Sequence, residues 1–181
     1  MARYRRYRKY TRRNRGRWST NIQELGTTTI LVNNQGAFYK DFTLAFNPLQ
    51  TNTATSQVYT VKNIEVTFEV SRISDGGSPD GDKLEDITAY IMYVPQGMSL
   101  STDYNLQHPE YIMAYKFLGS PTTDSPTSMA QPTKIKTRLS RRLQTGDSVI
   151  LFIKGNNTNS STPYAQRCEF HGISRWWTKA N

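Results

Sequence analysis

Polar and apolar residues alternate along much of this chain, which is the pattern of β-strands that bury one face. The clearest alternation runs through residues 63–71, where the apolar side chains are Ile64, Val66, Phe68 and Val70. The polar side chains between them predict an antiparallel strand with one face in solvent. Residues 148–154 (SVILFIK) are continuously apolar instead, which predicts a strand buried on both faces.

Five further segments have the β-branched and aromatic composition of strands, and turn-forming residues separate them. They are residues 27–32, 38–46, 86–94, 133–139 and 164–177. One segment breaks this period of two. Pro109 and Glu110 suit the start of a helix and Gly119 suits its end, so we expect a short helix at about residues 108–118.

These elements amount to about eight strands and one short helix, in a chain whose 181 residues suit a single domain. We therefore predict an all-β fold, namely an eight-stranded antiparallel jelly-roll sandwich with one short inserted helix. The sandwich would comprise residues 21–181, and residues 1–20 would form a disordered basic N-terminal arm. No apolar run approaches the ~18 residues of a membrane-spanning helix.

Charge is unevenly distributed between this arm and the rest of the chain. The sequence has 23 Lys and Arg against 14 Asp and Glu, a net charge of +9. Residues 1–17 hold nine cations and no acid: Arg3, Arg5, Arg6, Arg8, Lys9, Arg12, Arg13, Arg15 and Arg17. Removing these nine from the 23 leaves 14 cations, which equals the number of acids. The body is therefore formally neutral, and the whole net charge belongs to the arm.

The composition of the arm favours a single-stranded nucleic acid as its partner. An arginine guanidinium donates two hydrogen bonds to one phosphate, and eight of the nine cations are arginine. Aromatic rings, which stack on unpaired bases, are interleaved with the cations at Tyr4, Tyr7, Tyr10 and Trp18. Like charges at this density cannot fold alone, so we expect disorder without a partner. A nuclear-import signal, read by a host importin, and a solubilising tail are the alternatives.

A second basic feature lies in the strand predicted at residues 133–139. Lys134, Lys136 and Arg138 share one face, opposite Ile135, Thr137 and Leu139, and Arg141 and Arg142 follow. Three interpretations remain open at this point. The face is simply solvated, or it meets phosphate, or it contacts acidic loops of a neighbouring subunit.

The sequence holds no recognisable catalytic or cofactor motif. Neither the phosphate-binding GxxxxGK[ST] loop nor the GxSxG elbow is present. Cys168 and His171 are three residues apart in a predicted strand, so they face opposite sides and make a poor metal site. The acidic, Gly-rich residues 75–82 lack the pattern of a calcium loop, and we interpret them as an exposed loop. We therefore expect a protein that is not an enzyme and has no metal or cofactor.

The order of these features is similar to one known family. The segments that carry the likeness are MARYRRYRKYTRRNRGRW, then VYTVKNIEVTFEV at residues 58–70, HPEYIMAYKFLGSP, KTRLSRRLQTGDSVILFIKG and SRWWTK. Together they cover most of the chain. In them the chain resembles the capsid proteins of small circular single-stranded DNA viruses, the circovirus-like group, although it is shorter than the familiar animal circovirus capsids and has a shorter arm.

The resemblance implies a structural role in a virion. It implies a T=1 shell of sixty copies, an interior arm that packages the genome, and import into the host nucleus through the arm. The implied partners are further copies of the chain, single-stranded DNA rather than RNA, a host importin and a host-cell surface receptor, without a membrane. The alternative is a cellular or satellite-virus β protein that binds RNA or single-stranded DNA with a basic tail. A cellular module of that kind would have a net basic body.

Overall fold

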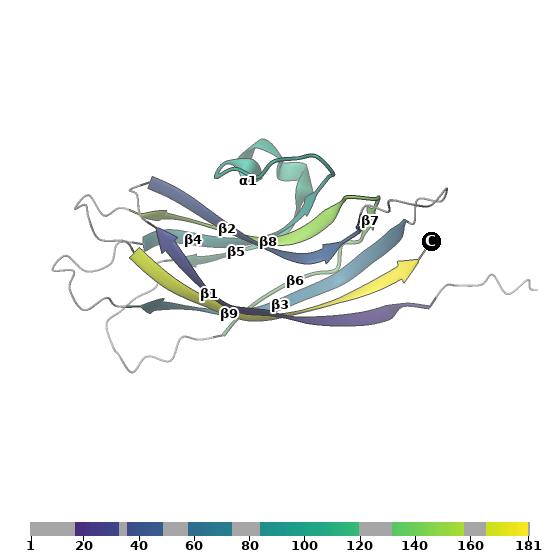
Figure 1. Cartoon of the computed structure of the whole chain (residues 1–181), viewed down its shortest axis with the longest axis horizontal. Helices are drawn as coiled ribbons and strands as arrows, with labels where there is room; N and C mark the ends of the chain where they lie inside the picture. Colours follow the sequence, from purple (N-terminus) through teal and green to yellow (C-terminus); the bar gives the residue numbers. More distant parts are fainter. Residues whose placement is uncertain are drawn as a thin grey trace, which may run out of the picture.

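Two antiparallel sheets face each other in the computed structural model, which describes residues 17–32, 36–48, 58–73, 84–119, 132–157 and 166–180 (Figure 1). The strands are β1 (Ser19–Val32), β2 (Gly36–Phe46), β3 (Tyr59–Ile73), β4 (Leu84–Val94), β5 (Ile112–Gly119), β6 (Thr133–Thr137), β7 (Arg141–Leu143), β8 (Ser148–Asn157) and β9 (Gln166–Ala180). The helical elements are α1 (Tyr104–Gln107) and a 3-10 turn, η1 (Pro109–Tyr111).

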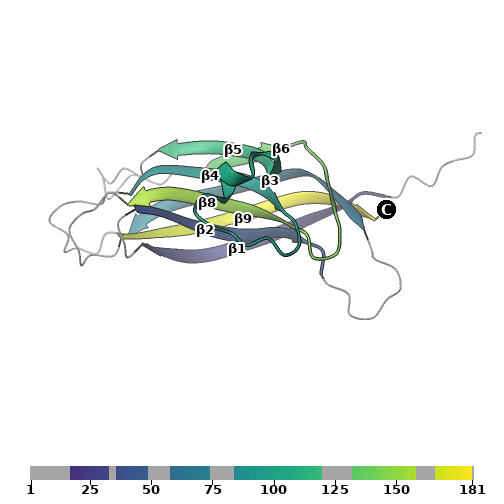
Figure 2. The ribbon, with the colours of Figure 1, turned by 90° about the horizontal axis from the view of Figure 1, so that it is seen from above.

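The strand order is that of a jelly roll. The lower sheet in Figure 1 has the order β1-β9-β3-β6, and the upper sheet has the order β2-β8-β4-β5. Strand β7 also pairs with β3, since Leu143 lies opposite Tyr59 while Thr133 of β6 lies opposite Phe68. β6 and β7 therefore act as one interrupted strand, and the predicted eight-stranded jelly-roll sandwich is confirmed. Viewed from above, β1 and β2 form one edge and β5 and β6 the other (Figure 2).

The main core lies between the two sheets. Ile64, Val66 and Phe68 of β3 are buried there, as their alternation predicted. The Phe170 ring stacks between Phe42 and Phe68, at centroid distances of 4.2 and 5.4 Å. Burial of such rings and branched side chains, at roughly 25 cal/mol per Å², is the main stabilising contribution to the sandwich.

A second, smaller core covers the outer face of the upper sheet. Ile150 and Phe152 of β8 point away from the main core and pack with Met92 and Tyr104. Tyr104 belongs to α1, which lies above this sheet, and only 1% of its surface is exposed (Figure 1). Strand β8 is therefore buried on both faces, which confirms the interpretation of its continuously apolar sequence.

The helix predicted at residues 108–118 is wrong. The helical turn comes earlier, at α1, and Pro109 begins η1 instead. The rest of the segment is strand β5, in which Tyr115 pairs with Tyr90 of β4. Its Ile, Tyr and Phe residues favour strands, and pairing with β4 satisfies the backbone in an extended form. The predicted stop is correct in position, because Gly119, at a φ of 74°, ends the strand.

Two apolar residues depart from the expected burial. Strand β2 has a register shift between Thr43 and Ala45, so Phe46 turns outward and is 49% exposed. Strand β6 ends at Thr137, and Leu139 is 54% exposed instead of lying beneath the sheet. The predicted exposed loop at residues 75–82 lies outside the described residues.

Candidate nucleic-acid interface

The described chain begins at the root of the predicted arm. Arg17 and Trp18 are exposed and lead directly into β1, which starts at Ser19, eight residues before the strand predicted at 27–32. The other arm candidates lie outside the described residues: Arg3, Tyr4, Arg5, Arg6, Tyr7, Arg8, Lys9, Tyr10, Arg12, Arg13 and Arg15. The structure therefore positions the end of the arm at the β1 edge of the lower sheet.

Cations and indole rings meet on the outer face of the lower sheet beside this root. The register places Lys62 of β3 opposite Trp177 of β9. The Lys62 ammonium lies 3.8 Å from the centre of the Trp18 ring, and the Arg175 guanidinium lies 5.1 Å from the Trp177 ring. Both are cation–π contacts, which link the start of β1 to the strands beside it.

One carboxylate stands among the cations further along the same face. Glu65 is paired across strands with Arg175 on one side and Lys136 on the other. Its Oε1 lies 2.8 Å from Lys134 Nζ and 3.7 Å from Arg175 Nη2. The hydrogen bond from Lys134 is the largest influence that lowers the pKa of Glu65, so the group is ionised at neutral pH. Glu65 thus neutralises the cations beside it only in part.

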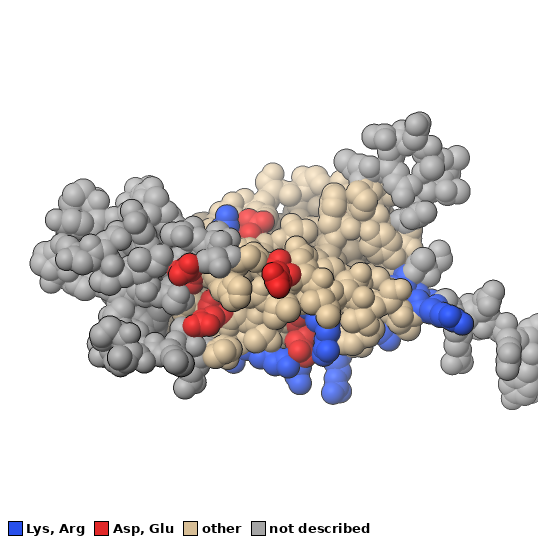
Figure 3. Space-filling view, turned by 60° about the horizontal axis from the view of Figure 1, so that its bottom comes forward, with Lys and Arg blue, Asp and Glu red and all other residues tan. Residues whose placement is uncertain are grey.

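We call the resulting surface the outer basic face, defined as Lys62, Lys134, Lys136, Arg142 and Arg175. Figure 3 shows Lys and Arg side chains gathered along the lower margin of this side of the molecule, with an acidic side chain among them. Because the strand order is β1-β9-β3-β6, the face runs from the root of the arm toward β6.

The cations of residues 134–142 do not share one surface. Lys134, Lys136 and Arg138 are exposed, as the alternation predicted. Arg142 lies opposite Thr60, near the start of β3. Arg141 is different, because its Nη2 donates to the Glu110 carbonyl oxygen at 2.7 Å. Its guanidinium also lies 5.5 Å from the Tyr93 ring. Arg141 therefore holds the 3-10 turn against the body and does not contribute to the outer basic face.

Three contributors to this interface were not identified from the sequence: Lys62, Arg175 and Trp177. Lys62 lies just before the strand predicted at residues 63–71, and Arg175 and Trp177 lie in the mixed segment at residues 164–177. Their proximity depends on the register of β3 against β9, which shifts between Lys62 and Glu65, where Asn63 has a φ of 50°. The cluster of Arg and two Trp in SRWWTK was the available signal.

No protein-family model matches this sequence, and no curated protein matches it. Among solved structures, the chain is similar to a structure of infectious bursal disease virus Gt strain, with 7% identity and a TM-score of 0.42 over 89% of this chain and 32% of that chain. It thus spans about a third of the length of that chain. It is also similar to desmodium yellow mottle tymovirus, with 11% identity and a TM-score of 0.39 over 93% of this chain and 89% of that one.

A third similar structure is that of a decameric BFDV capsid protein, with 12% identity and a TM-score of 0.33 over 91% of this chain and 99% of that chain. All three identities are at or below 12%, and all three TM-scores are at or below 0.42. The fold description therefore rests on the strand pairing of the chain itself.

The side chains of the outer basic face and the neighbouring indole rings can form ion pairs and stacking contacts. Within the described residues, no group of three or more His, Cys, Asp or Glu side chains is placed to hold a metal ion. The same part of the chain contains no helix long and apolar enough to cross a membrane. Guanidinium and ammonium groups beside indole rings can contact phosphates and bases together.

Proposed function

We propose that this chain is a viral capsid protein that assembles with copies of itself into a closed shell and packages a single-stranded genome. The observation that carries the proposal is the separation of charge. Residues 1–17 hold the entire excess of nine cations, whereas the jelly-roll body is formally neutral. A neutral body packs against its copies without long-range repulsion, and the arm is left to meet a polyanion.

The physical basis of packaging in this proposal is the exchange of counterions. Each arm cation that neutralises a phosphate releases a condensed counterion, so binding is strong at low salt and independent of sequence. The arm aromatics stack on unpaired bases, which favours a single strand over a duplex. Lys62 and Arg175 extend the positive surface from the arm root onto the folded body, and this continuity supports a genome that lies against the lower sheet.

The finer form of the proposal follows the resemblance to circovirus-like capsids. It comprises a T=1 shell of sixty copies, a circular single-stranded DNA genome, and import of the chain into the host nucleus by an importin. An importin groove and a phosphate backbone both attract clustered cations, so one arm serves both partners. In this role the protein acts by binding and assembly, without catalysis.

Sedimentation and electron microscopy of the purified full chain test the proposal. We expect closed particles of uniform size that contain nucleic acid. A small monomer that binds nucleic acid would contradict the shell and favour the cellular module. Digestion of the extracted nucleic acid by a deoxyribonuclease but not by a ribonuclease is the result expected for a DNA genome, and the reverse would favour a satellite-virus protein.

A further inference from the structure

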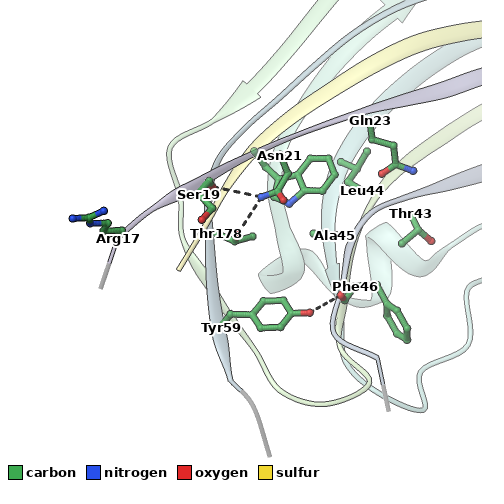
Figure 4. A pocket seen from close by; sticks show the side chains of 11 residues that line it. Arg17, Ser19, Asn21, Gln23, Thr43, Leu44, Ala45, Phe46, Tyr59 and Thr178 are labelled. Carbon is green, nitrogen blue, oxygen red and sulfur yellow. Dashed lines mark hydrogen bonds between the residues drawn. The ribbon is translucent and has the colours of Figure 1, made fainter. Parts of the chain in front are cut away.

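A cleft of about 540 Å³ opens at the root of the arm, where the edges of the two sheets part between β1 and β2 (Figure 4). Strand β1, with residues of β3 and β9, forms one wall, and β2 forms the other. The residues on which the argument rests are Arg17, Asn21, Gln23, Thr43, Phe46 and Tyr59. This volume lies within the range of small-ligand sites, which is roughly 300–1,000 Å³.

The inner face of β1 is polar at this cleft, against the usual pattern of a sandwich. Asn21 and Gln23 turn their side chains toward the interior, whereas Ile22 between them points outward and is 66% exposed. Asn21 Nδ2 donates to Thr178 Oγ1 at 3.0 Å. Asn21 is half-buried and Gln23 is exposed at the cleft, so their amide groups are accessible to a ligand that forms hydrogen bonds.

Aromatic side chains complete the lining. Phe46 and Tyr59 both line the cleft, although the Phe46 side chain is half exposed, and the Tyr59 hydroxyl donates to the Phe46 carbonyl oxygen at 2.8 Å. This bond fixes the Tyr59 ring beside Phe46, as Figure 4 shows. Rings next to amide groups that both donate and accept are the combination that recognises an unstacked nucleobase through its face and its edge.

The position of Arg17 connects the cleft to the arm. Arg17 is the last cation of the arm, and Figure 4 shows it at the outer end of the cleft, pointing away from the interior. A strand held by the arm would therefore pass this guanidinium, which suits a phosphate outside the cleft while the attached base enters it.

We propose that the cleft binds one nucleobase of the single strand that the arm holds. This inference rests on the proposed function and adds to it a base-binding site on the folded body. A second copy of the chain is the other conceivable occupant. The amide groups of Asn21 and Gln23 favour the base, because the edge of a base presents donors and acceptors that match them.

The test compares two strands that differ only in their bases. One is a single-stranded DNA oligonucleotide about 16 nucleotides long, and the other is an abasic strand with the same number of phosphates. Binding of each to the full chain is measured at one salt concentration. We expect the strand with bases to bind at least about tenfold more tightly, because stacking adds to the phosphate contacts.

Two leucine variants on opposite faces of β1 isolate the cleft. Asn21→Leu changes the inner face, and Thr20→Leu makes a comparable change on the outer face. We expect N21L to reduce the preference for bases about fivefold with the affinity for the abasic strand unchanged, and T20L to leave both as in the wild type. Stacking of bases on the arm aromatics is the same in the wild type and in both variants, so it does not affect the difference in base preference between them. Should N21L fail to fold, as checked by thermal unfolding, Gln23→Leu replaces it.

The outcomes separate this inference from the proposed function. An unchanged base preference in N21L and in Q23L would overturn the cleft site and leave packaging by the arm intact. Altered particle formation with an unchanged preference would assign the cleft to a second copy and also overturn it. If the wild type bound neither strand even at low salt, the proposed function and the cleft site would fail together.

Discussion

The two sheets of this sandwich share one core but differ on their outer faces. The upper sheet is covered by residues of α1 and its neighbours, and Phe152 and Ile150 of β8 are buried beneath them. The lower sheet has no such cover among the described residues, and its outward side chains include Arg175, Lys136 and Ile173. One sheet thus uses its outer face for stability, whereas the other leaves that face available for a partner.

The basic arm is connected to the lower sheet, whose outer face is uncovered among the described residues. Arg17 leads into β1, so the most positive segment of the chain starts at the edge of the face that already carries cations. Charge that would destabilise a covered, low-dielectric layer is tolerated on an open surface. The division between a covered and an open sheet is therefore consistent with the division between assembly and nucleic-acid binding that we propose.

The largest expected effect concerns the second core. Phe152→Ala should reduce the free energy of unfolding by about 4 kcal/mol, because it leaves a cavity beneath α1. Ile173→Ala, on the open face of the lower sheet, should cost less than about 1 kcal/mol. Chemical denaturation of the unassembled chain measures both values. Equal losses would show that the lower sheet is also covered.

The next effect concerns the turn that joins β7 to β8. Buried Asp147 accepts hydrogen bonds from the Tyr93 hydroxyl at 2.7 Å and from the backbone N–H groups of Gln96 and Gln144 at 3.0 and 2.8 Å. Asp147→Ala should therefore lower the free energy of unfolding by about 3 kcal/mol, and Tyr93→Phe by about 1 kcal/mol. A loss for Y93F as large as that for D147A would mean that the backbone contacts contribute little.

The third prediction concerns nucleic-acid binding by the open face. Replacing Lys62, Lys136 and Arg175 with glutamine should lower the slope of log affinity against log salt by about 2, because each phosphate contact on a single strand contributes about 0.7. Binding titrations with a single-stranded oligonucleotide at several salt concentrations measure this slope.

The control for this variant has the same loss of charge on the other sheet. Lys40, Lys116 and Lys154 lie on β2, β5 and β8, and their replacement with glutamine should leave the slope close to that of the wild type. Equal reductions by the two triple variants would indicate that only net charge matters, and that the position of these three cations on the outer basic face has no special role.

The smallest effect is the pH dependence of Glu65. Its pKa is lowered in the folded chain, so its contribution to stability is complete above the unfolded pKa and is lost as the pH falls through the folded pKa. The Lys134 side chain is about half exposed and solvent screens the pair, so Glu65→Gln should cost less than about 1 kcal/mol at neutral pH. Denaturation at neutral and acidic pH should show wild type and E65Q converging in acid. A gap that widens in acid would reverse the assigned sign.

Patterns of burial made much of this fold predictable. The alternation in β3 correctly indicated a strand with one buried face, and the continuous apolar run in β8 correctly indicated a strand with two. Both were visible because a buried position generally requires an apolar residue. The helix prediction for the segment that forms β5 was wrong, since Pro109 and Glu110 carry local helix signals that pairing with β4 overrides.

The interface was less accessible to sequence reasoning than the fold. The cations of the arm are contiguous, so their common purpose is visible in the sequence. The contact of Lys62 with Trp18 joins β3 to the residue just before β1, and it depends on a register that shifts near Asn63. Ile22 is exposed whereas the polar Asn21 beside it faces the cleft, and the sequence did not indicate this arrangement. It arises where the two sheets part, so no local pattern of residues predicts it.

Nuclease protection tests the central claim most directly. Particles of the full chain and of a variant lacking residues 1–17 are purified, treated with nuclease and analysed for surviving nucleic acid. We expect shells from both, with protected nucleic acid in the full-chain particles and almost none in the truncated ones. Equal protection by the truncated shells would contradict packaging by the arm, and failure of the variant to assemble at any salt concentration would contradict the division between arm and body.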